Sequence, residues 1–398
     1  MVVGFYDCSK WKKVGGKFPR RQKAPSLKMM NFTDLAKELK NHFNRPIDGP
    51  WDNDIFSRLA LRVFEYQYSS NSTYANYAEK RGATPSRLRD WKKIPPVPTL
   101  AFKEFPIVSG DPSLVEAVFK TSGTSSSELG RGEHHILDLS LYRASLIGSM
   151  RHQFYSQESP ALLALVKDPA QSQFSSLSFM LGETLDNLSM GKGGFYVNED
   201  NQLQNEKLVN DIRKFESSGY PVLLAGTAFA FVRWMDWLEE RGICFELSTN
   251  SRIMETGGFK GQSREVSRVE LYELLGRLHG VPISSIISEY GMTEMLSQLY
   301  ERTSVIQETG EIEHLGYEPP PWVRSLVLDV NTLSELPAGE QGVLCHFDLA
   351  NVGSAMAVLT EDVGVTLGNG TIRLVGRLKE AEQRGCSLAM DDFPEILI

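Results

Sequence analysis

The stretch from residue 283 to residue 295, Ile-Ser-Ser-Ile-Ile-Ser-Glu-Tyr-Gly-Met-Thr-Glu-Met, joins an apolar run to a polar turn. Residues 283–288 have the length and composition of a buried strand. The turn that follows carries an aromatic ring, a hydroxyl and a carboxylate, those of Tyr290, Thr293 and Glu294. At a strand exit these groups suit a nucleotide: Tyr290 to stack on a base, Thr293 to donate to a phosphate and Glu294 to hold Mg²⁺. The same residues also fit a simple strand-ending turn in which Thr-Glu caps a helix.

Short apolar runs, each followed by a loop, recur upstream of this stretch. Three of them predict further buried strands, over residues 161–166, 222–226 and 252–255. Helical periodicity fills the intervals, with one helix through Trp234 that stops at Gly242 and another over about residues 264–279. Strand, loop, helix and strand in this order indicate parallel βαβ units of an α/β fold. Because such sheets bind ligands at the carboxyl ends of their strands, the loops after residues 226, 255 and 288 are the expected binding region.

The pattern changes after about residue 322, where short strands follow one another without helices between them. Four strands are predicted, over residues 325–329, 342–347, 355–359 and 371–375. Glycine-rich turn signals separate them at residues 337–339 and 368–370. This section predicts an antiparallel or barrel-like subdomain that closes the fold.

The first hundred residues predict helices and a basic tail. Apolar residues at helical spacing predict helices over residues 31–44, capped by Asn31, and 54–67, and the prolines at 95–98 indicate a connection. Residues 1–30 hold eight Lys or Arg against one Asp, a charge of +7, whereas the whole 398-residue chain carries −8. We expect a disordered tail there. The alternatives are a true start at Met29 or Met30, or an arm that binds a partner or a membrane surface.

A second polar stretch, Lys-Thr-Ser-Gly-Thr-Ser-Ser-Ser-Glu-Leu-Gly-Arg-Gly at residues 120–132, is dense in hydroxyls and glycine. Glycine lets backbone N–H groups turn toward an anion, and the hydroxyls add further donors. Such a loop can hold the phosphates of a nucleotide, although a flexible surface loop has the same composition. It is not a Walker A loop, because no Gly-Lys-Ser/Thr ends it. His134 and His135 follow it, and they either orient a substrate carboxylate or are bystanders.

Three smaller features complete the pattern. Asp362 precedes Val363-Gly364 and offers a carboxylate to ribose hydroxyls, or is simply the Asp of a β-turn. Gly-Arg-Leu-Lys at residues 376–379 ends the last predicted strand. Ser-Ser-Leu-Ser at residues 175–178 caps either a helix or a ligand, and the sequence does not separate the two.

Taken in this order, these motifs resemble those of the adenylate-forming superfamily of acyl-CoA synthetases. Within it the chain looks most like the LuxE family, the acyl-protein synthetases of bacterial bioluminescence, with phenylacetate–CoA ligase as a cousin. The segments that carry the resemblance lie at residues 119–125, 175–180, 255–261, 288–295, 348–351 and 376–387. The resemblance implies an α/β fold with parallel βαβ subdomains, a small β-barrel section and a C-terminal lid domain reduced to a stub. An adenylate-forming domain would then occupy residues 31–375, and residues 376–398 would be the truncated C-terminal segment.

The resemblance also implies that the chain uses ATP and Mg²⁺ to convert a long-chain fatty acid into an acyl-adenylate. Glu294 would be catalytic by holding Mg²⁺, which offsets the developing charge. Asp362 would bind the ribose, and Arg377 would bind ribose or phosphate oxygens. The implied nucleotide-binding residues are Thr121, Ser122, Gly123, Thr124, Gly257, Gly258, Tyr290, Gly291, Thr293, Asp362 and Arg377.

The acyl acceptor implied by the resemblance is Cys386, which lies in an Arg-Gly-Cys-Ser context at residues 384–387. A thiolate is a good nucleophile, and a thioester is easily passed on. Arg384 and Lys379 lie close in sequence and would lower the pKa of the thiol. Without the resemblance, Cys386 reads as a buried or incidental cysteine.

Two departures from the superfamily pattern concern positive charge. The usual phosphate loop carries a lysine, whereas this loop carries Glu128 and Arg131. The usual C-terminal domain, with its adenylation lysine, has no room in the 22 residues after Gly376. Lys379 and Arg131 are candidates to neutralise charge in their place, and Lys260 ranks lowest.

The resemblance therefore implies an ATP-dependent fatty acid–protein ligase that acylates Cys386 and hands the acyl group to a LuxC-like acyl reductase subunit, in an oligomeric complex. The alternatives are an acyl- or aryl-CoA ligase of the phenylacetate–CoA ligase type and a non-catalytic scaffold. The acidic net charge argues against nucleic-acid binding, and no apolar run is long enough to predict a transmembrane helix. Scattered cysteines favour the cytoplasm, with Cys244 and Cys345 expected in the core.

Overall fold

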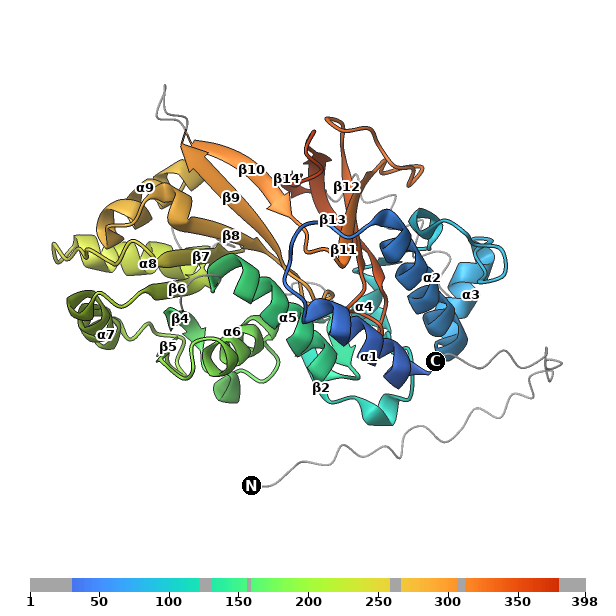
Figure 1. The fold of residues 1–398 in the computed structure, drawn as a ribbon, viewed down its shortest axis with the longest axis horizontal. Coiled ribbons are helices and arrows are strands. Elements are labelled where there is room, and N and C mark those ends of the chain that lie inside the picture. The colour runs from blue at the N-terminus through green and yellow to red at the C-terminus, as the bar shows by residue number, and fades with distance from the viewer. Residues whose placement is uncertain (1–30, 122–129, 156–158, 258–265, 306–311, 379–398) are drawn as a thin grey trace.

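The computed structural model describes residues 31–121, 130–155, 159–257, 266–305 and 312–378 (Figure 1). Its α-helices are α1 (Phe32–Phe43), α2 (Asn53–Ser70), α3 (Ser72–Lys80), α4 (Ala101–Glu104), α5 (Leu139–Phe154), α6 (Ser176–Asn187), α7 (Asn205–Ser218), α8 (Ala228–Glu239) and α9 (Arg268–His279). Its 3₁₀ turns are η2 (Trp91–Lys93), η3 (Pro112–Leu114), η4 (Pro169–Gln171) and η5 (Ile283–Ser285). Its strands are β1 (Val97–Pro98), β2 (Ala117–Lys120), β3 (Glu133–Ile136), β4 (Ala161–Lys167), β5 (Gly193–Val197), β6 (Val222–Thr227), β7 (Arg252–Thr256), β8 (Ile286–Tyr290), β9 (Leu299–Val305), β10 (Ile312–Glu318), β11 (Val323–Leu328), β12 (Gln341–Asp348), β13 (Ala357–Thr366) and β14 (Ile372–Arg377).

Within the described residues, twelve strands form one sheet in the order β11-β12-β13-β14-β10-β9-β8-β7-β6-β4-β5, with β1 beside β13. Strands β4 to β8 pair in parallel, as the βαβ pattern predicts. From β8 onward the neighbours in this order pair antiparallel, and β10 joins the two regions by pairing with β9 on one side and β14 on the other. The predicted barrel-like section is therefore antiparallel, and it continues the sheet of the parallel strands.

The parallel part of the sheet is covered by helices on both faces, which explains the continuous apolar runs. Leu162 and Ala164 of β4 belong to a core that includes residues of α5 and α6. Leu163 and Leu165 belong to a second core, which includes residues of α8 and α9. Because side chains alternate across a strand, each of these runs packs into both cores at once.

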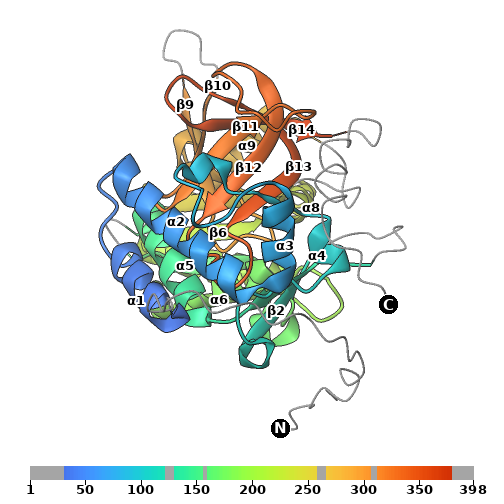
Figure 2. The ribbon, with the colours of Figure 1, turned by 90° about the vertical axis from the view of Figure 1, so that its right-hand side faces the viewer.

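Helices α2 and α3 lie on the antiparallel side of the molecule and α1 lies beside α5, as Figures 1 and 2 both show. A buried side-chain amide, that of Gln67 on α2, makes the key polar contact. Its Nε2 donates to the carbonyl oxygens of Asn351 at 2.8 Å and Val352 at 3.1 Å, and its Oε1 accepts from the N–H of Met356 at 3.2 Å. Helix α2 is thereby fixed to the turn between β12 and β13.

Most of the predicted helices and strands are confirmed, but the start of one strand and the burial of one cysteine were predicted wrongly. Asn31 caps α1 as predicted, since its side chain accepts from the N–H of Thr33 at 2.7 Å. The strand predicted over 283–288 begins only at Ile286, because Pro282 (φ −66°) leads into the 3₁₀ turn η5 instead. Cys345 is buried as expected, but Cys244 is exposed, in the turn after α8 where its neighbour Phe245 fills the core.

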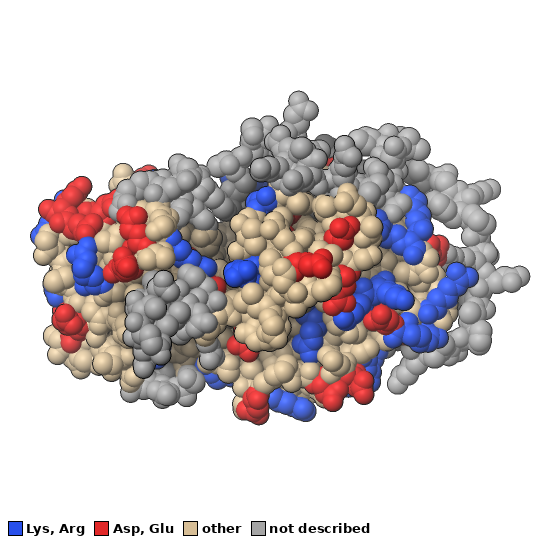
Figure 3. Space-filling model, turned by 90° about the horizontal axis from the view of Figure 1, so that it is seen from above, with Lys and Arg blue, Asp and Glu red and all other residues tan. Residues whose placement is uncertain are grey.

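Side chains of both charges are spread over the face seen in Figure 3. The longest helix of the described part, α2, has 18 residues and exposes charged side chains such as Arg58 and Glu65. None of the described helices has the length and apolarity needed to cross a bilayer.

Candidate functional site

The carboxyl ends of β6, β7 and β8 lie side by side and form the edge on which the site is built. Thr227 of β6 is paired with Thr256 of β7, and Thr256 is paired with Glu289 of β8. Gly257 follows Thr256 and leaves the sheet there, whereas Tyr290 follows Glu289 and is the last residue of β8, paired with Leu299 of β9. Gly257 has a φ of +71°, a conformation that favours glycine and turns the chain away from the sheet.

Tyr290, Asp362 and Arg377, which are far apart in sequence, meet beside this edge. The Tyr290 hydroxyl donates to Oδ2 of Asp362 at 2.9 Å, and Nε of Arg377 donates to Oδ1 of Asp362 at 2.8 Å. Asp362 and Arg377 are cross-strand partners on β13 and β14. The alternative that Asp362 belongs to a β-turn is therefore wrong, because it lies inside a strand. The fold brings three of the sequence motifs into one hydrogen-bonded group.

His346 and Tyr317, which the sequence did not single out, fix the ring of Tyr290. Their ring centroids lie 5.4 and 5.7 Å from that of Tyr290. His346 places Nε2 3.3 Å from the Tyr290 hydroxyl and Nδ1 2.7 Å from Oγ of Ser325. Burial raises the pKa of Tyr290 and lowers the pKa of His346 to about 4, so both are neutral near pH 7. The sequence shows His346 only as a histidine within a predicted apolar strand, a pattern that does not distinguish a site residue from a core residue.

Glu294 lies four residues beyond the end of β8 and is buried. Burial raises the pKa of its carboxyl group to about 7, while the positive charges of Arg377 and Lys103 act in the opposite direction. In the part of the chain that the structure describes, Glu294 forms no ion pair. A buried carboxyl group in this position takes up a proton readily, and a bound cation would stabilise its ionised form.

The ends of the 120–132 loop close directly beside Glu294. The N–H of Thr121 donates to the carbonyl oxygen of Gly132 at 2.9 Å, and the N–H of Gly132 donates to Oγ1 of Thr121 at 3.0 Å. A Cβ on Gly132 would lie 3.2 Å from Cγ2 of Thr121 and 3.7 Å from Oε1 of Glu294. The base of the hydroxyl-rich loop and the Glu294 carboxyl group are therefore parts of one site.

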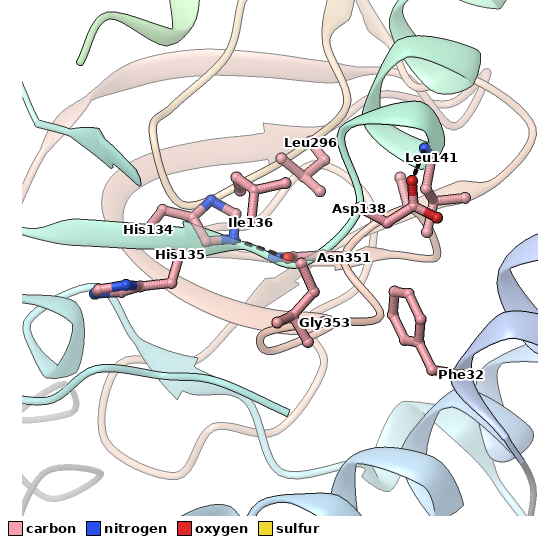
Figure 4. A pocket seen from close by; sticks show the side chains of 11 residues that line it. Phe32, His134, His135, Ile136, Asp138, Leu141, Leu296, Asn351 and Gly353 are labelled. Atoms are coloured by element: carbon pink, nitrogen blue, oxygen red, sulfur yellow. Dashed lines mark hydrogen bonds between the residues drawn. The ribbon is translucent and has the colours of Figure 1, made fainter. Parts of the chain in front are cut away.

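His134 holds the backbone of the turn that carries Glu294, so of the two alternatives left open for this residue the structure does not support the one in which it orients a substrate. Its ring is fully buried, with Nδ1 2.7 Å from the carbonyl oxygen of Thr293 and Nε2 2.9 Å from Oδ1 of Asn351 (Figure 4). The Asn351 amide nitrogen donates to the carbonyl oxygens of Glu294 and Ala355, each at 2.8 Å. The pocket drawn in Figure 4 adjoins this contact, and none of the residues predicted to bind nucleotide lines it. His134 is thus a structural clamp on the Thr293–Glu294 backbone.

Replacing His134 with alanine is expected to lower the free energy of unfolding by about 1–3 kcal/mol, because the neutral imidazole donates one hydrogen bond here and a buried acceptor loses it. Its neighbour offers a matched control. Among the described residues, the side chain of His135 is paired with Glu133 alone, at 3.4 Å, so His135→Ala should cost less than about 1 kcal/mol. Urea unfolding followed by tryptophan fluorescence measures both. Equal losses in the two variants would contradict the clamp.

Asp348 holds the other end of the Glu294 turn. Its Oδ2 accepts from the N–H of Leu296 at 2.9 Å, and its Oδ1 accepts from the Ser297 hydroxyl at 2.7 Å and the N–H of Ala350 at 2.9 Å. Burial raises the pKa of Asp348 to about 6. The Asp-Leu-Ala-Asn stretch at 348–351, noticed in the sequence only as part of a resemblance, therefore ties β12 to the turn after β8.

Two more buried carboxyl groups, those of Glu255 and Glu289, face opposite sides of the sheet. Glu255 accepts from the Tyr272 hydroxyl of α9 at 3.1 Å, and Glu289 accepts from the Thr256 hydroxyl. Burial raises the pKa of both groups, that of Glu289 to about 7. Since each is bonded within the sheet or to a covering helix, we assign both to the core.

The remaining predicted residues divide into those that are described and those that are not. Gly291 and Arg131 are exposed, Thr293 is half-buried, and Ser175 caps α6 by accepting from the N–H of Ser178 at 3.1 Å. The predictions that lie outside the described residues are Ser122, Gly123, Thr124, Glu128, Gly258, Lys260, Lys379, Arg384 and Cys386. Roles for those residues stay predictions.

Comparisons with known proteins agree on one family. The family model described as "Acyl-protein synthetase, LuxE" matches residues 45–393. A long-chain-fatty-acid–luciferin-component ligase of Vibrio harveyi is 26% identical over 348 residues, covering 84% of this chain and 87% of that protein. The ligase of the same name from Aliivibrio fischeri is 22% identical over 353 residues, covering 85% of this chain and 88% of that protein.

Among solved structures, an open conformation of 2-hydroxyisobutyryl-CoA ligase in complex with 2-HIB-AMP and CoA superposes with a TM-score of 0.61. It is 14% identical and covers 83% of this chain and 75% of that one. At this identity the likeness shows the fold alone. The α/β fold of the adenylate-forming ligases, expected from the sequence, is thereby confirmed.

Proposed function

Because the chain belongs to the LuxE family of acyl-protein synthetases, and is thus an enzyme of the ligase class, we propose that it uses ATP to attach a long-chain fatty acid to its own Cys386. The observation that carries the proposal is the meeting of Tyr290, Asp362 and Arg377 beside Glu294 and the base of the 120–132 loop. Such a group offers a ribose acceptor, a phosphate-binding loop and a carboxylate in one place.

In the first step a carboxylate oxygen of the fatty acid attacks the α-phosphorus of ATP. The P–O bond to pyrophosphate breaks, pyrophosphate leaves with the electron pair, and an acyl-adenylate remains. Asp362 accepts hydrogen bonds from the ribose while Tyr290 and Arg377 hold its carboxylate in place. Thr121 donates to phosphate oxygens together with Ser122, Gly123 and Thr124. Gly257, Gly258 and Gly291 leave room for the base, and Thr293 offers a further donor.

The buried carboxylate of Glu294 fits a Mg²⁺ ion. No cluster of three or more His, Cys, Asp or Glu able to hold a metal exists among the described residues. Mg²⁺, however, is commonly bound by one or two carboxylates together with substrate phosphates, so a single carboxylate beside a phosphate loop is sufficient. Bound there, the ion would neutralise charge on the phosphates.

In the second step the Cys386 thiolate attacks the acyl carbonyl carbon of the adenylate. A C–S bond forms, the C–O bond to AMP breaks, and AMP leaves. Residues 31–375 act as the adenylate-forming domain, and residues 376–398 act as a short arm that brings Cys386 to the site. Lys379 and Arg384 favour the thiolate form.

The thioester then passes to a thiol or an active site of a second protein. An acyl reductase subunit of the LuxC type suits this role, because a thioester is reduced to an aldehyde more readily than a free carboxylate. Association of the two proteins in the cytoplasm would keep the reactive acyl group from water.

Adenylation can be tested by fatty-acid-dependent exchange of labelled pyrophosphate into ATP, across a series of acyl chain lengths. The proposal expects exchange that needs ATP, Mg²⁺ and a long-chain acid but no CoA. If none of the acids tested supports exchange, a non-catalytic scaffold would be favoured. A product that forms only when CoA is added, with no acyl group on the protein, would favour an acyl-CoA ligase.

The dependence of this exchange on Mg²⁺ is expected to change with pH. Since the pKa of Glu294 is raised to about 7, protons compete with the cation below that pH and not above it. The apparent affinity for Mg²⁺ should fall about tenfold per pH unit below the pKa and level off above it. Half-saturating Mg²⁺ concentrations measured on either side of this pKa give the comparison, and a pH-independent affinity would remove Glu294 as the ligand.

A further inference from the structure

Lys103 lies on α4, a short helix that packs against β1 and β3 and reaches the base of the 120–132 loop. A Cβ on Gly132 would lie 3.5 Å from Cγ of Lys103 and 3.7 Å from Oε1 of Glu294. The stem of Lys103 and the carboxyl group of Glu294 therefore flank the same glycine. Neither the sequence motifs nor the resemblance pointed to this residue.

The ammonium group of Lys103 has no hydrogen-bond or ion-pair partner among the described residues. Lys103 is half-buried, and its backbone N–H donates to the carbonyl oxygen of Leu100 at 3.0 Å. The neighbouring cations differ in this respect: Arg377 is bonded to Asp362, and Lys120 is paired with Glu133 at 2.8 Å. A half-buried ammonium group without a partner loses hydration and gains nothing until an anion arrives.

We propose that the ammonium group of Lys103 binds the β- and γ-phosphates of ATP at the base of the 120–132 loop. It thereby supplies the positive charge that other phosphate loops of this fold take from their own lysine. The inference rests on the proposed function, because it needs ATP as the ligand.

The charges around Glu294 are consistent with a nucleotide whose ribose lies at Asp362 and whose phosphates lie at Lys103. Asp362, Arg377 and Glu294 are the main charges that act on Tyr290, whereas Lys103 is among those that act on Glu294. Asp362 and Lys103 both act on the Glu294 carboxyl group, and the stem of Lys103 flanks the same glycine as that group. A nucleotide with its ribose at Asp362 and its phosphates at Lys103 would therefore pass Glu294.

The balance of charge gives a second argument. The carboxylates of Glu294 and Asp362 outnumber the guanidinium of Arg377, so without Lys103 these groups would leave a net negative charge facing a triphosphate. Glycine and hydroxyl donors bind phosphate but do not cancel its charge. Lys103 restores neutrality among these groups and leaves Mg²⁺ to offset the nucleotide.

Direct binding of ATP and AMP to Lys103→Met tests the proposal. Methionine keeps the apolar stem and removes only the charge. We expect the affinity for ATP to fall about 10- to 100-fold, the effect of one charge-assisted hydrogen bond, and the affinity for AMP to stay the same. Lys103→Arg should restore most of the ATP affinity. Lys93→Met, which changes an exposed lysine of η2, is the control for loss of charge alone. Titration calorimetry in the presence of Mg²⁺ measures all four proteins.

Each result bears on the proposal. Unchanged ATP affinity in Lys103→Met would overturn it while leaving the proposed function intact, provided that the unaltered protein binds ATP. An equal loss for ATP and AMP would also overturn it, because it would indicate damage to the whole site. A native protein that binds neither nucleotide would overturn both the inference and the proposed function.

Discussion

Glu294→Gln is expected to reduce fatty-acid-dependent pyrophosphate exchange by about 10²- to 10³-fold, the effect of losing one preorganised charge-stabilising group. The amide keeps the size of the side chain but cannot bind a cation as a carboxylate does. Loading of Cys386 should be lost together with exchange, since the second step needs the adenylate. The folded protein should survive, because burial already holds the pKa of Glu294 at about 7 and a neutral group is tolerated there.

Glu289→Gln is the matched control for this variant. Glu289 is also buried, its pKa is also raised to about 7, and it lies five residues earlier in the same strand-and-turn segment. It accepts from the Thr256 hydroxyl within the sheet, so its replacement should leave most of the exchange activity. Similar losses in both variants would mean that the region responds to any change of a buried acid. The specific role of Glu294 would then be wrong.

Cys386→Ala is expected to abolish covalent acylation while pyrophosphate exchange continues at the native rate. The thiol enters only after the adenylate has formed, so the first step does not need it. Wild-type protein should hold one acyl group per chain, and the variant none. Gel or filter assays with labelled fatty acid measure the acyl group, and the exchange assay on the same preparation measures adenylation.

The two cysteines in the described part of the chain, Cys244 and Cys345, provide the control for this experiment. Cys345 is fully buried, and burial raises the pKa of its thiol, which makes it a poor nucleophile. Cys244 is exposed but precedes the amino end of β7, whereas the site lies at the carboxyl end of that strand. Cys244→Ala should therefore keep the acyl group. Retention of label in Cys386→Ala and its loss in Cys244→Ala would reverse the assignment.

The parallel strands could be predicted because their burial on two faces leaves continuous apolar runs between loops. The run at 161–166 reappears as β4, and the run at 222–226 reappears as β6. The joining of the antiparallel section to the same sheet could not be read from the sequence. It depends on the pairing of β10 with β14, which joins residues far apart in sequence. Local hydrophobic periodicity carries no information about such a pairing.

The sequence pointed to those site residues that belong to a recognisable motif. It did not point to residues that only the fold brings to the site. Tyr290, Glu294, Asp362 and Arg377 were named from the sequence, and the fold places them together. Lys103 was missed because a lysine on a four-residue helix has no distinguishing neighbours. His346 and Asp348 were missed as site residues for a related reason, since a buried polar group in a strand resembles core until its partner is known.

We propose that this one chain both activates a fatty acid and carries it on Cys386. Intact-mass spectrometry after incubation with ATP, Mg²⁺ and saturated fatty acids of increasing length tests both steps in one measurement. We expect a mass gain of one acyl group that hydroxylamine removes at neutral pH, present in the native protein and in Cys244→Ala, and absent in Cys386→Ala. A native protein that gains no acyl group with any of these acids, or a Cys386→Ala variant that still gains one, would contradict it.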